Sequence, residues 1–500
     1  MVYTVPHYIA GATYADATTK SHPIYNPAIG KIAGQVHFAN DALCDKTVAI
    51  AKEAWLPWSQ TAPIKRARIL FKFRELLERY QNDLAKLVTK EQGKTLDDAM
   101  GSVARAIELV EFHCGLVSQL QGTLTSNVSQ QIDCSTLRQP LGVCAGVSPF
   151  NFPVMVPVWM IIPAIACGNT FILKPSEQDP SAVIRLMELL TEAGLPTGVA
   201  NCLQGDKNTV QQLLAHKDIK AFTAVASTPV AKSIYQTAIA HGKRAHTFGG
   251  AKNHGVVMPD ADMEHAANAI VGAAFGSAGE RCMALSVVVA VGEGTADALT
   301  SKLLPLIKAI QIGPGDVQGT DMGPLISRLH HQRVVQAIED GVKEGARLLV
   351  DGRQFTHNTH PEGYYIGPSV FDNVSETMAV YQNEIFGPVL VILKAANFED
   401  ALALVNHHQY GNGTAIFTRD GFSARDYAER VQVGMVGINV PIPVPVASHP
   451  FGGWKQSSFG DTNMHGMESI HFYTQLKTIT TKWPVTQLTE TSAFIMPTHQ

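Results

Sequence analysis

The sequence predicts an α/β protein built on mostly parallel sheets that helices cover on both faces. From residue 143 onwards, short apolar runs typical of strands alternate with helical patterns, and a second alternation with new strands begins near Gly249. The chain has 500 residues, 45% of them hydrophobic, which is more than one hydrophobic core usually serves. We therefore expect two or more packed domains.

The first 140 residues precede this alternation. A turn-rich opening is followed by three helical patterns, and a segment rich in Ser, Thr and Gln then predicts a strand hairpin. Gly93-Lys94-Thr95 matches the end of a phosphate-binding loop, but Val88 stands where that loop needs its first Gly, so we predict a turn between helices. The helices are expected at 41–56, 63–91 and 95–118, and the hairpin at 120–140.

The first set of strands is expected at 143–147, 170–173, 199–203, 221–225 and 244–248. Ligands bind such sheets at the carboxyl ends of the strands, where Lys174-Pro175-Ser176-Glu177 is found. Residues 141–173 are uncharged and long enough for a membrane span, but four prolines interrupt them, so a strand, loop, helix and strand are predicted instead.

The second set of strands is expected at 255–258, 286–291, 346–350, 389–393, 413–417 and 435–438. The proline-rich run 440–445 follows and favours a rigid extended wall. Residues 469–477 alternate like an edge strand that pairs with a neighbouring subunit.

Composition excludes several classes of function. The net charge of -4 leaves no cationic excess for nucleic acid or an anionic membrane, so neither partner is expected. Seven widely spread cysteines without Cys-x-x-Cys argue against disulfides or a zinc cluster, and no His-Glu-x-x-His spacing predicts a metal site. The N-terminal segment has neither a signal-peptide nor a transit-peptide pattern, so we expect a cytoplasmic protein.

The stretch 272–286 is the candidate for chemistry. Its three glycines let the backbone close around a ligand, and Arg281 beside Cys282 is expected to favour the thiolate, the nucleophilic form. The alternative is a cysteine packed as a small hydrophobe, but Cys282 lies in a loop before a strand, where functional groups are displayed. A serine-hydrolase reading of Gly276-Ser277-Ala278-Gly279 fails because Phe275 occupies the first Gly position.

Gly279-Glu280-Arg281-Cys282-Met283-Ala284-Leu285-Ser286 closely resembles the active-site segment of the aldehyde dehydrogenase superfamily. Its form, and Asn439-Val440-Pro441-Ile442-Pro443-Val444-Pro445, resemble the methylmalonate-semialdehyde dehydrogenase branch. The resemblance implies a Rossmann-type NAD-binding domain, an α/β catalytic domain and a small β element that joins subunits into a dimer or tetramer. Their expected extents are 1–119 with 141–249, then 250–446, and finally 120–140 with 447–490.

The resemblance also implies roles for individual residues. Cys282 would be the nucleophile and Asn151 the oxyanion donor, while Arg105 and Arg281 would hold a substrate carboxylate. NAD would be bound although no Gly-x-Gly-x-x-Gly follows any strand, and Ala226 replaces the usual Gly before Ser227, which is expected to cap a helix beneath the pyrophosphate. The residues implied for NAD are Phe150, Lys174, Glu177, Ser227, Gly249, Glu384 and Phe386.

The expected acyl acceptor follows from one motif in which this chain differs from the hydrolytic members of the superfamily. Hydrolytic members carry a water-activating Glu in a Glu-Leu-Gly-Gly motif, and this chain has Thr247-Phe248-Gly249-Gly250. Thr is no general base near neutral pH, whereas the thiol of coenzyme A ionises without one. We therefore expect oxidation of methylmalonate or malonate semialdehyde with coenzyme A, through a Cys thioester and decarboxylation, to propanoyl-CoA or acetyl-CoA. The alternatives are a hydrolytic aldehyde dehydrogenase with another base and a catalytically silent protein of this fold.

Overall fold

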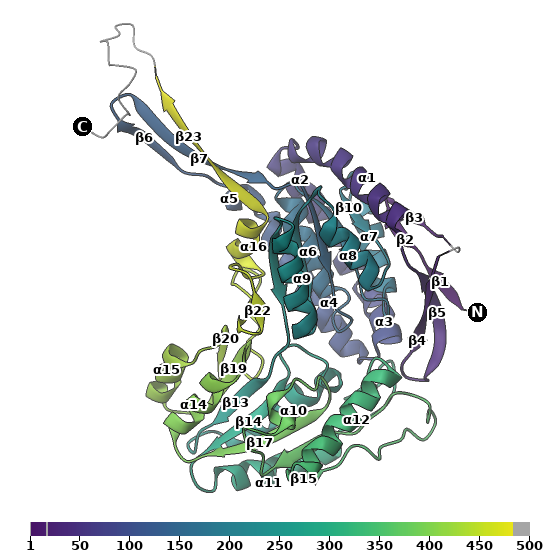
Figure 1. Cartoon of the computed structure of the whole chain (residues 1–500). Coiled ribbons are helices and arrows are strands. Elements are labelled where there is room, and N and C mark those ends of the chain that lie inside the picture. Colours follow the sequence, from purple (N-terminus) through teal and green to yellow (C-terminus); the bar gives the residue numbers. More distant parts are fainter. Residues whose placement is uncertain (1, 17–18, 484–500) are drawn as a thin grey trace.

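The computed structural model describes residues 2–16 and 19–483. An eight-stranded sheet forms the upper body in Figure 1, in the order β22-β12-β11-β8-β9-β10-β2-β3. Its five central strands run parallel and confirm the first predicted set, while the edge strands pair antiparallel. The central strands are β8 (Val143–Val147), β9 (Thr170–Lys174), β10 (Ala200–Cys202), β11 (Ile219–Val225) and β12 (Arg244–Phe248), and the edges are β22 (Ser458–Phe459), β2 (His7–Ile9) and β3 (Ala12–Tyr14).

Helices cover both faces of this sheet (Figure 1). Side chains alternate along β8, so Val143 and Ala145 pack into one core with α1, α8 and α9, and Cys144 packs into the other with α2, α3, α4, α6 and α7. The helices are α1 (Asp41–Ser59), α2 (Pro63–Arg79), α3 (Gln81–Gln92), α4 (Leu96–Cys114), α5 (Leu116–Gln119), α6 (Met155–Ala166), α7 (Ser181–Glu192), α8 (Lys207–Ala215) and α9 (Thr228–Ala240).

Two of the predicted helices are each divided in the structure. The pattern over 63–91 is interrupted at Tyr80, which leaves helical geometry at φ -102° and ψ 16°, and the pattern over 95–118 is interrupted at Gly115. Residues 141–173 form the predicted strand, loop, helix and strand. In the part of the chain that the structure describes, no helix is both long and apolar enough to span a membrane.

A seven-stranded sheet forms the lower body, in the order β15-β16-β17-β14-β13-β19-β20, and all of its strands except β15 run parallel. It confirms the second predicted set and adds β16, which lies between β15 and β17. The strands are β13 (Asn253–Val257), β14 (Leu285–Val291), β15 (Arg347–Val350), β16 (Ser369–Asp372), β17 (Val389–Ala395), β19 (Gly413–Phe417) and β20 (Met435–Ile438). The helices here are α10 (Met263–Phe275), α11 (Thr295–Ala309), α12 (Arg328–Lys343), α13 (Ala379–Gln382), α14 (Phe398–His407) and α15 (Gly421–Arg430).

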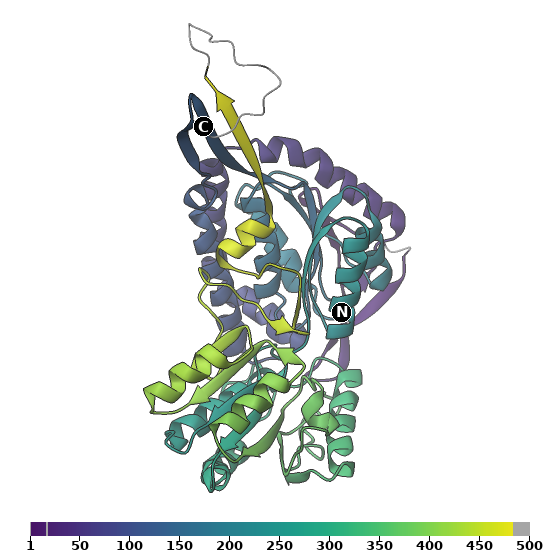
Figure 2. The same ribbon diagram turned by 60° about the vertical axis from the view of Figure 1, so that its left-hand side comes forward.

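A three-stranded antiparallel sheet extends from the upper body as an arm (Figures 1 and 2). The predicted hairpin supplies β6 (Leu124–Ser129) and β7 (Ile132–Pro140), and β23 (Thr474–Lys482) pairs with β7 over nine residues. The strand expected over 469–477 is partly wrong, because α16 (Gly466–Phe472) takes its first half. Buried Gly466, Ser469 and Ile470 recur at helical spacing there.

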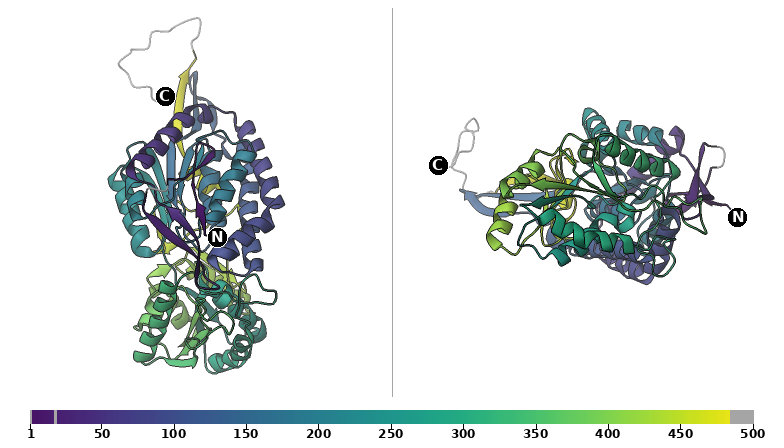
Figure 3. Two further views of the ribbon diagram at one scale, coloured as in Figure 1. Left: turned by 90° about the vertical axis from the view of Figure 1, so that its right-hand side faces the viewer. Right: turned by 90° about the horizontal axis from the view of Figure 1, so that it is seen from below.

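The remaining strands form two small sheets that the sequence did not predict. β1 (Tyr3–Val5), β5 (Lys31–His37) and β4 (Ser21–Asn26) form a sheet that faces the viewer in the left panel of Figure 3. β18 (Tyr410–Gly411) pairs with β21 (Trp454–Lys455). Within 447–490, β22 joins the eight-stranded sheet and α16 packs on α6, so only β23 belongs to the arm; residues 484–490 lie outside the described ones.

Candidate active site

The candidate residues converge where the two large sheets face each other. In the eight-stranded sheet the chain proceeds from β8 to β9 on one side and returns to β11 on the other, so the loops after β8 and β11 flank the crevice where such sheets bind ligands. These loops carry Phe150, Asn151 and Ser227. In the seven-stranded sheet Cys282 precedes β14 and Glu384 precedes β17, so both lie at the amino ends of adjacent strands.

The loop before Cys282 has an unusual backbone. Ser277 and Ala278 take left-handed conformations, with φ of 54° and 52°, and Gly279 follows at 73°. Each costs an L-residue about 1–2 kcal/mol, and such strain is typical of functional sites. A Cβ on Gly279 would lie 2.2 Å from the Gly387 carbonyl oxygen, so this loop packs directly against the segment that carries Glu384.

Two asparagines that sequence reasoning missed hold this loop in place through hydrogen bonds to its backbone. The Asn253 Nδ2 donates to the carbonyl oxygens of Cys282 and Ala284, both at 2.9 Å, and the Asn412 Nδ2 donates to that of Cys282 at 3.1 Å. Both residues stand directly before or at the start of a strand of the seven-stranded sheet. The available signal was an Asn beside glycines at a strand start, as in Gly411-Asn412-Gly413.

The resting thiol is protonated, contrary to the expectation that Arg281 would favour the thiolate. Burial and the nearby Glu384 charge raise the pKa of Cys282 to about 12, and the backbone N–H groups of Cys282 and Met283 and the Lys94 charge oppose this only partly. The Arg281 guanidinium is directed elsewhere: its Nη2 donates to Asp98 Oδ1 at 2.6 Å. Cys282 remains half-buried rather than sealed in the core.

The two arginines have different surroundings. Arg281 packs over Gly276, where a Cβ would lie 2.5 Å from its Nη1, and it lines a small cavity together with Cys282. Arg105 lies on α4 and donates to the carbonyl oxygens of Val444 at 3.2 Å and Pro445 at 2.8 Å, so it connects α4 to the proline-rich run.

Asn151 is buried, and its side chain has no hydrogen bond to the described residues, which leaves its amide free to donate. The residues on either side of Asn151, Phe150 and Phe152, contact residues that surround Cys282. The Phe150 ring meets the Phe386 ring edge-on at 5.8 Å, and Lys94, whose charge acts on Cys282, lies 4.0 Å above the Phe152 ring. His330, another residue that sequence reasoning missed, donates from Nε2 to the Phe386 carbonyl oxygen at 2.7 Å.

Glu384 is held by the segment that follows β12. Its Oε1 accepts from the Ala251 N–H at 2.8 Å, and Lys252 donates to the Val380 and Asn383 carbonyl oxygens, both at 2.8 Å. Burial raises the pKa of Glu384 to about 7, against the Ala251 hydrogen bond and the Lys252 charge. A Cβ on Gly250 would lie 2.5 Å from Glu384 Oε2, so a larger residue there would displace the Glu384 carboxylate.

The other residues implied for NAD lie at carboxyl ends of parallel strands. Lys174 ends β9, and its Nζ meets Glu177 Oε2 at 2.6 Å. Gly249 follows β12, and its N–H donates to the Ser457 carbonyl oxygen at 3.0 Å. The expectation that the Ser227 side chain caps α9 is wrong, because it makes no capping bond and is exposed, while the neighbouring Thr228 Oγ1 accepts from the Gly250 N–H at 2.8 Å.

Thr247 is directed at α9. It is fully buried in β12, and its hydroxyl donates to the Ala231 carbonyl oxygen of α9 at 2.9 Å. The side chain expected from the sequence at the position of the hydrolytic Glu is therefore occupied in packing the helix onto the sheet.

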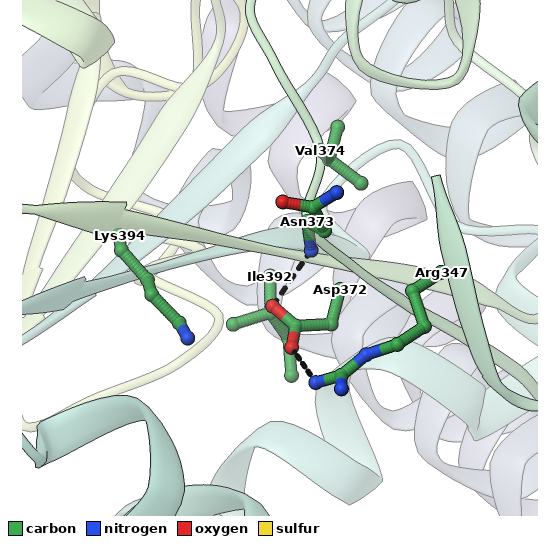
Figure 4. Close-up of a pocket in the computed structure, with 6 residues that line it drawn as sticks. All are labelled: Arg347, Asp372, Asn373, Val374, Ile392 and Lys394. Atoms are coloured by element: carbon green, nitrogen blue, oxygen red, sulfur yellow. Dashed lines mark hydrogen bonds and ion pairs between the residues drawn. The ribbon is translucent and has the colours of Figure 1, made fainter. Parts of the chain in front are cut away.

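A pocket of about 450 Å³ at the outer strands of the seven-stranded sheet offers no comparable chemistry. Figure 4 shows the Arg347 guanidinium and the Asn373 N–H both directed at the Asp372 carboxylate, which they satisfy. Among the described residues, no group of three or more potential metal-ligating side chains is found.

Comparisons with known proteins identify the family of the chain. The model of the aldehyde dehydrogenase family matches residues 14–479. A malonate-semialdehyde dehydrogenase of Pseudomonas aeruginosa is 48% identical over 99% of both chains, and the human mitochondrial methylmalonate-semialdehyde/malonate-semialdehyde dehydrogenase [acylating] is 44% identical over 99% of this chain and 93% of its own.

Two solved structures are equally similar. The methylmalonate-semialdehyde dehydrogenase of Oceanimonas doudoroffii superposes with a TM-score of 0.96 at 48% identity, and a Sinorhizobium meliloti structure in complex with NAD does so with 0.96 at 50%; each match covers 97% of this chain and 99% of the other. With a family match and relatives of this extent, the chain belongs to the aldehyde dehydrogenase family and is an oxidoreductase of that superfamily.

Proposed function

We propose that the protein oxidises malonate or methylmalonate semialdehyde with NAD and transfers the acyl group to coenzyme A. The observation that carries the choice of acceptor is Thr247: it is buried and hydrogen-bonded to α9, so no base stands at the position that hydrolytic relatives use. The names of the similar malonate-semialdehyde dehydrogenases and of the acylating human enzyme support the substrate class.

The residues at the carboxyl ends of β9 and β11 support binding of a dinucleotide. α9 begins there with 13 residues, its first N–H groups suit a phosphate, and the Ser227 hydroxyl beside them is exposed and not used as a cap. Glu177 offers a carboxylate to a ribose. Phe150, Lys174, Glu384 and Phe386 would complete the binding set. Bound NAD would take the hydride from the aldehyde carbon.

The protein's own groups account for the covalent steps. Cys282, once deprotonated, attacks the carbonyl carbon, and the Asn151 amide and the Cys282 N–H donate to the oxygen on which negative charge develops. Arg281 and Arg105 would hold the distal carboxylate with two-pronged donors. Oxidation leaves a thioester on Cys282.

The thioester carries a carboxylate on its α carbon, directly beside the thioester carbonyl. That carboxylate leaves as carbon dioxide, its bonding electrons passing to the carbonyl of the thioester, and a proton completes the acetyl or propanoyl group. The coenzyme A thiolate then attacks the thioester carbonyl and releases the Cys282 thiolate.

Pre-steady-state NADH formation tests this proposal. Without coenzyme A we expect a burst near one NADH per active site and then slow turnover, because water attacks the thioester unaided. Adding coenzyme A should restore fast turnover with acetyl-CoA or propanoyl-CoA as product.

One observation favours hydrolysis as a second candidate. Glu384 is a carboxyl group with a pKa of about 7 whose charge acts on Cys282, and a group of that pKa can serve as a general base. Fast steady NADH formation without coenzyme A, with a free acid as product, would establish the hydrolytic function and refute the acylating one.

Assembly into a dimer or tetramer is part of the same proposal. The arm exposes large apolar side chains, among them Leu124 (70% exposed) and Leu476 (60%), which a partner subunit would cover. Analytical ultracentrifugation should show a species of at least twice 53.9 kDa, and a monomer at micromolar concentration would contradict this.

A further inference from the structure

Lys94 is a buried cation that the proposed steps do not use. It lies in the turn between α3 and α4, its side chain has no exposed surface, and its Nζ is 3.5 Å from Asp98 Oδ2. Neither of these two atoms has a hydrogen-bond partner among the described residues. Burying an ammonium group in this way costs folding free energy unless nearby groups of opposite charge or hydrogen-bond acceptors compensate its charge.

The turn is fixed to the segment that carries Cys282. Gln92 accepts from the Lys94 N–H at 2.9 Å and donates from Nε2 to Glu280 Oε2 at 2.9 Å, and Glu280 Oε1 accepts from the Ile326 N–H at 3.1 Å. The backbone of Lys94 is therefore positioned relative to Arg281 and Cys282 by direct hydrogen bonds.

Asp98 lies between two cations. Its Oδ1 accepts from Arg281 Nη2 at 2.6 Å, and its Oδ2 faces Lys94. Glu280 is hydrogen-bonded to Gln92 and to the Ile326 N–H rather than to Asp98 or Arg281, and burial raises its pKa well above the usual value. Burial lowers the pKa of Lys94, and the Asp98 charge opposes this. With Lys94 protonated, Lys94, Asp98 and Arg281 together carry one net positive charge, whereas Asp98 and Arg281 alone would carry none.

Arg105, the second arginine proposed to bind the substrate carboxylate, lies on the same side of α4 as Asp98. Asp98, Ser102 and Arg105 are spaced by four and three residues, which places them on one face of the helix. Ser102 is buried and its hydroxyl also has no hydrogen-bond partner in the described part of the chain. A polar stripe thus runs from Lys94 to Arg105 through an otherwise apolar helix face.

We propose that Lys94 and Asp98 are positioning residues that determine the preference for aldehydes bearing a carboxylate. Asp98 holds the Arg281 guanidinium beside Cys282, and Lys94 offsets the charge of Asp98, so that Arg281 presents a net positive charge to the substrate. The inference rests on the proposed function, in which the substrate is a semialdehyde acid.

The first variant is Lys94→Met, which keeps the volume but leaves the cluster neutral. We expect kcat/KM for malonate semialdehyde to fall roughly tenfold relative to that for propanal, the effect of one charge about 10 Å away at an effective dielectric constant of about 20. Loss of the Lys94 charge at Cys282 affects both aldehydes alike and cancels in this ratio. Lys86→Met, on the exposed face of α3, is the matched control and should leave this ratio unchanged.

The second variant reverses the sign. Asp98→Asn keeps an oxygen for Arg281 and adds one positive charge, so kcat/KM for malonate semialdehyde relative to that for propanal should stay equal or rise. The double variant Lys94→Met/Asp98→Asn restores the net charge, and this ratio should return to within about threefold of wild type.

The outcomes separate the two proposals. If wild type does not prefer malonate semialdehyde over propanal in kcat/KM, the proposed substrate class fails before any variant is considered. If it does, but Lys94→Met impairs both aldehydes equally, or Asp98→Asn lowers kcat/KM for the acid relative to that for propanal as Lys94→Met does, the positioning role is overturned. An unchanged thermal unfolding midpoint shows that the single variants are folded.

Discussion

Replacing Gly279 by Ala should separate the two motifs that meet at the active site. The new Cβ would lie 2.2 Å from the Gly387 oxygen and 2.5 Å from its carbonyl carbon, while ordinary contact begins near 3.4 Å, so the backbones must move apart by about 1.2 Å. A displacement of about 1 Å at the reacting groups costs roughly 100-fold in rate. The left-handed φ of 73° adds about 1–2 kcal/mol of destabilisation.

The measurement is kcat for NADH formation with saturating coenzyme A, together with the thermal unfolding midpoint. Gly272→Ala is the matched control, because a Cβ there meets no described atom within 4 Å and Ala favours a helix over Gly. We expect a large loss of kcat for Gly279→Ala and none for Gly272→Ala. Retention of kcat within about threefold by Gly279→Ala would show that the contact with Gly387 does not position the thiol.

Three further predictions concern individual side chains. In the enzyme without ligands, iodoacetamide should alkylate Cys282 faster with each pH unit up to pH 10, because only the thiolate reacts and burial with the Glu384 charge raises the pKa of the thiol to about 12. Cys282→Ala should lack this phase of alkylation and form no NADH. An alkylation rate that levels off near pH 8 would refute the raised pKa. NAD should give a higher kcat/KM than NADP, since the Glu177 carboxylate repels a 2′-phosphate, and equal values would remove that role. Arg281→Leu and Arg105→Leu should impair semialdehyde acids far more than propanal, whereas equal losses would dismiss the carboxylate role.

Periodicity predicted the buried strands well and the peripheral ones poorly. Val143–Val147 and Val389–Ala395 are apolar runs whose burial on both faces leaves a plain signal. β16 (Ser369–Asp372) has only four residues and ends in a charged one, and it is a strand because β15 and β17 pair with it. Pairing between distant segments is not visible in a local pattern, which is also why the N-terminal strands were read as turns.

The site was predictable where the chain resembles its family and less so where contacts set the electrostatics. Cys282, Asn151 and Glu384 could be located from their motifs. Arg281 pairs with Asp98, which lies 183 positions away in the sequence, so the sequence did not show this pairing. Because Arg281 is adjacent to Cys282, the sequence suggested a lowered pKa of the thiol, whereas burial and the Glu384 charge raise that pKa. The sequence assigned Lys94 no role because its motif does not match a phosphate-binding loop, although Asp98, four residues further on, indicated an ion pair.

The arm also has a consequence for biosynthesis. β7 ends at Pro140 and its partner β23 begins at Thr474, so 334 residues (474 less 140) must be made before the pair can form. At about 5–20 residues per second, the ribosome needs roughly 15–70 s for this stretch, during which one edge of the β6–β7 hairpin has no partner from its own chain. Nascent chains on one messenger would present the same open edge to one another, so synthesis at low temperature or with an excess of chaperones should raise the yield of folded protein.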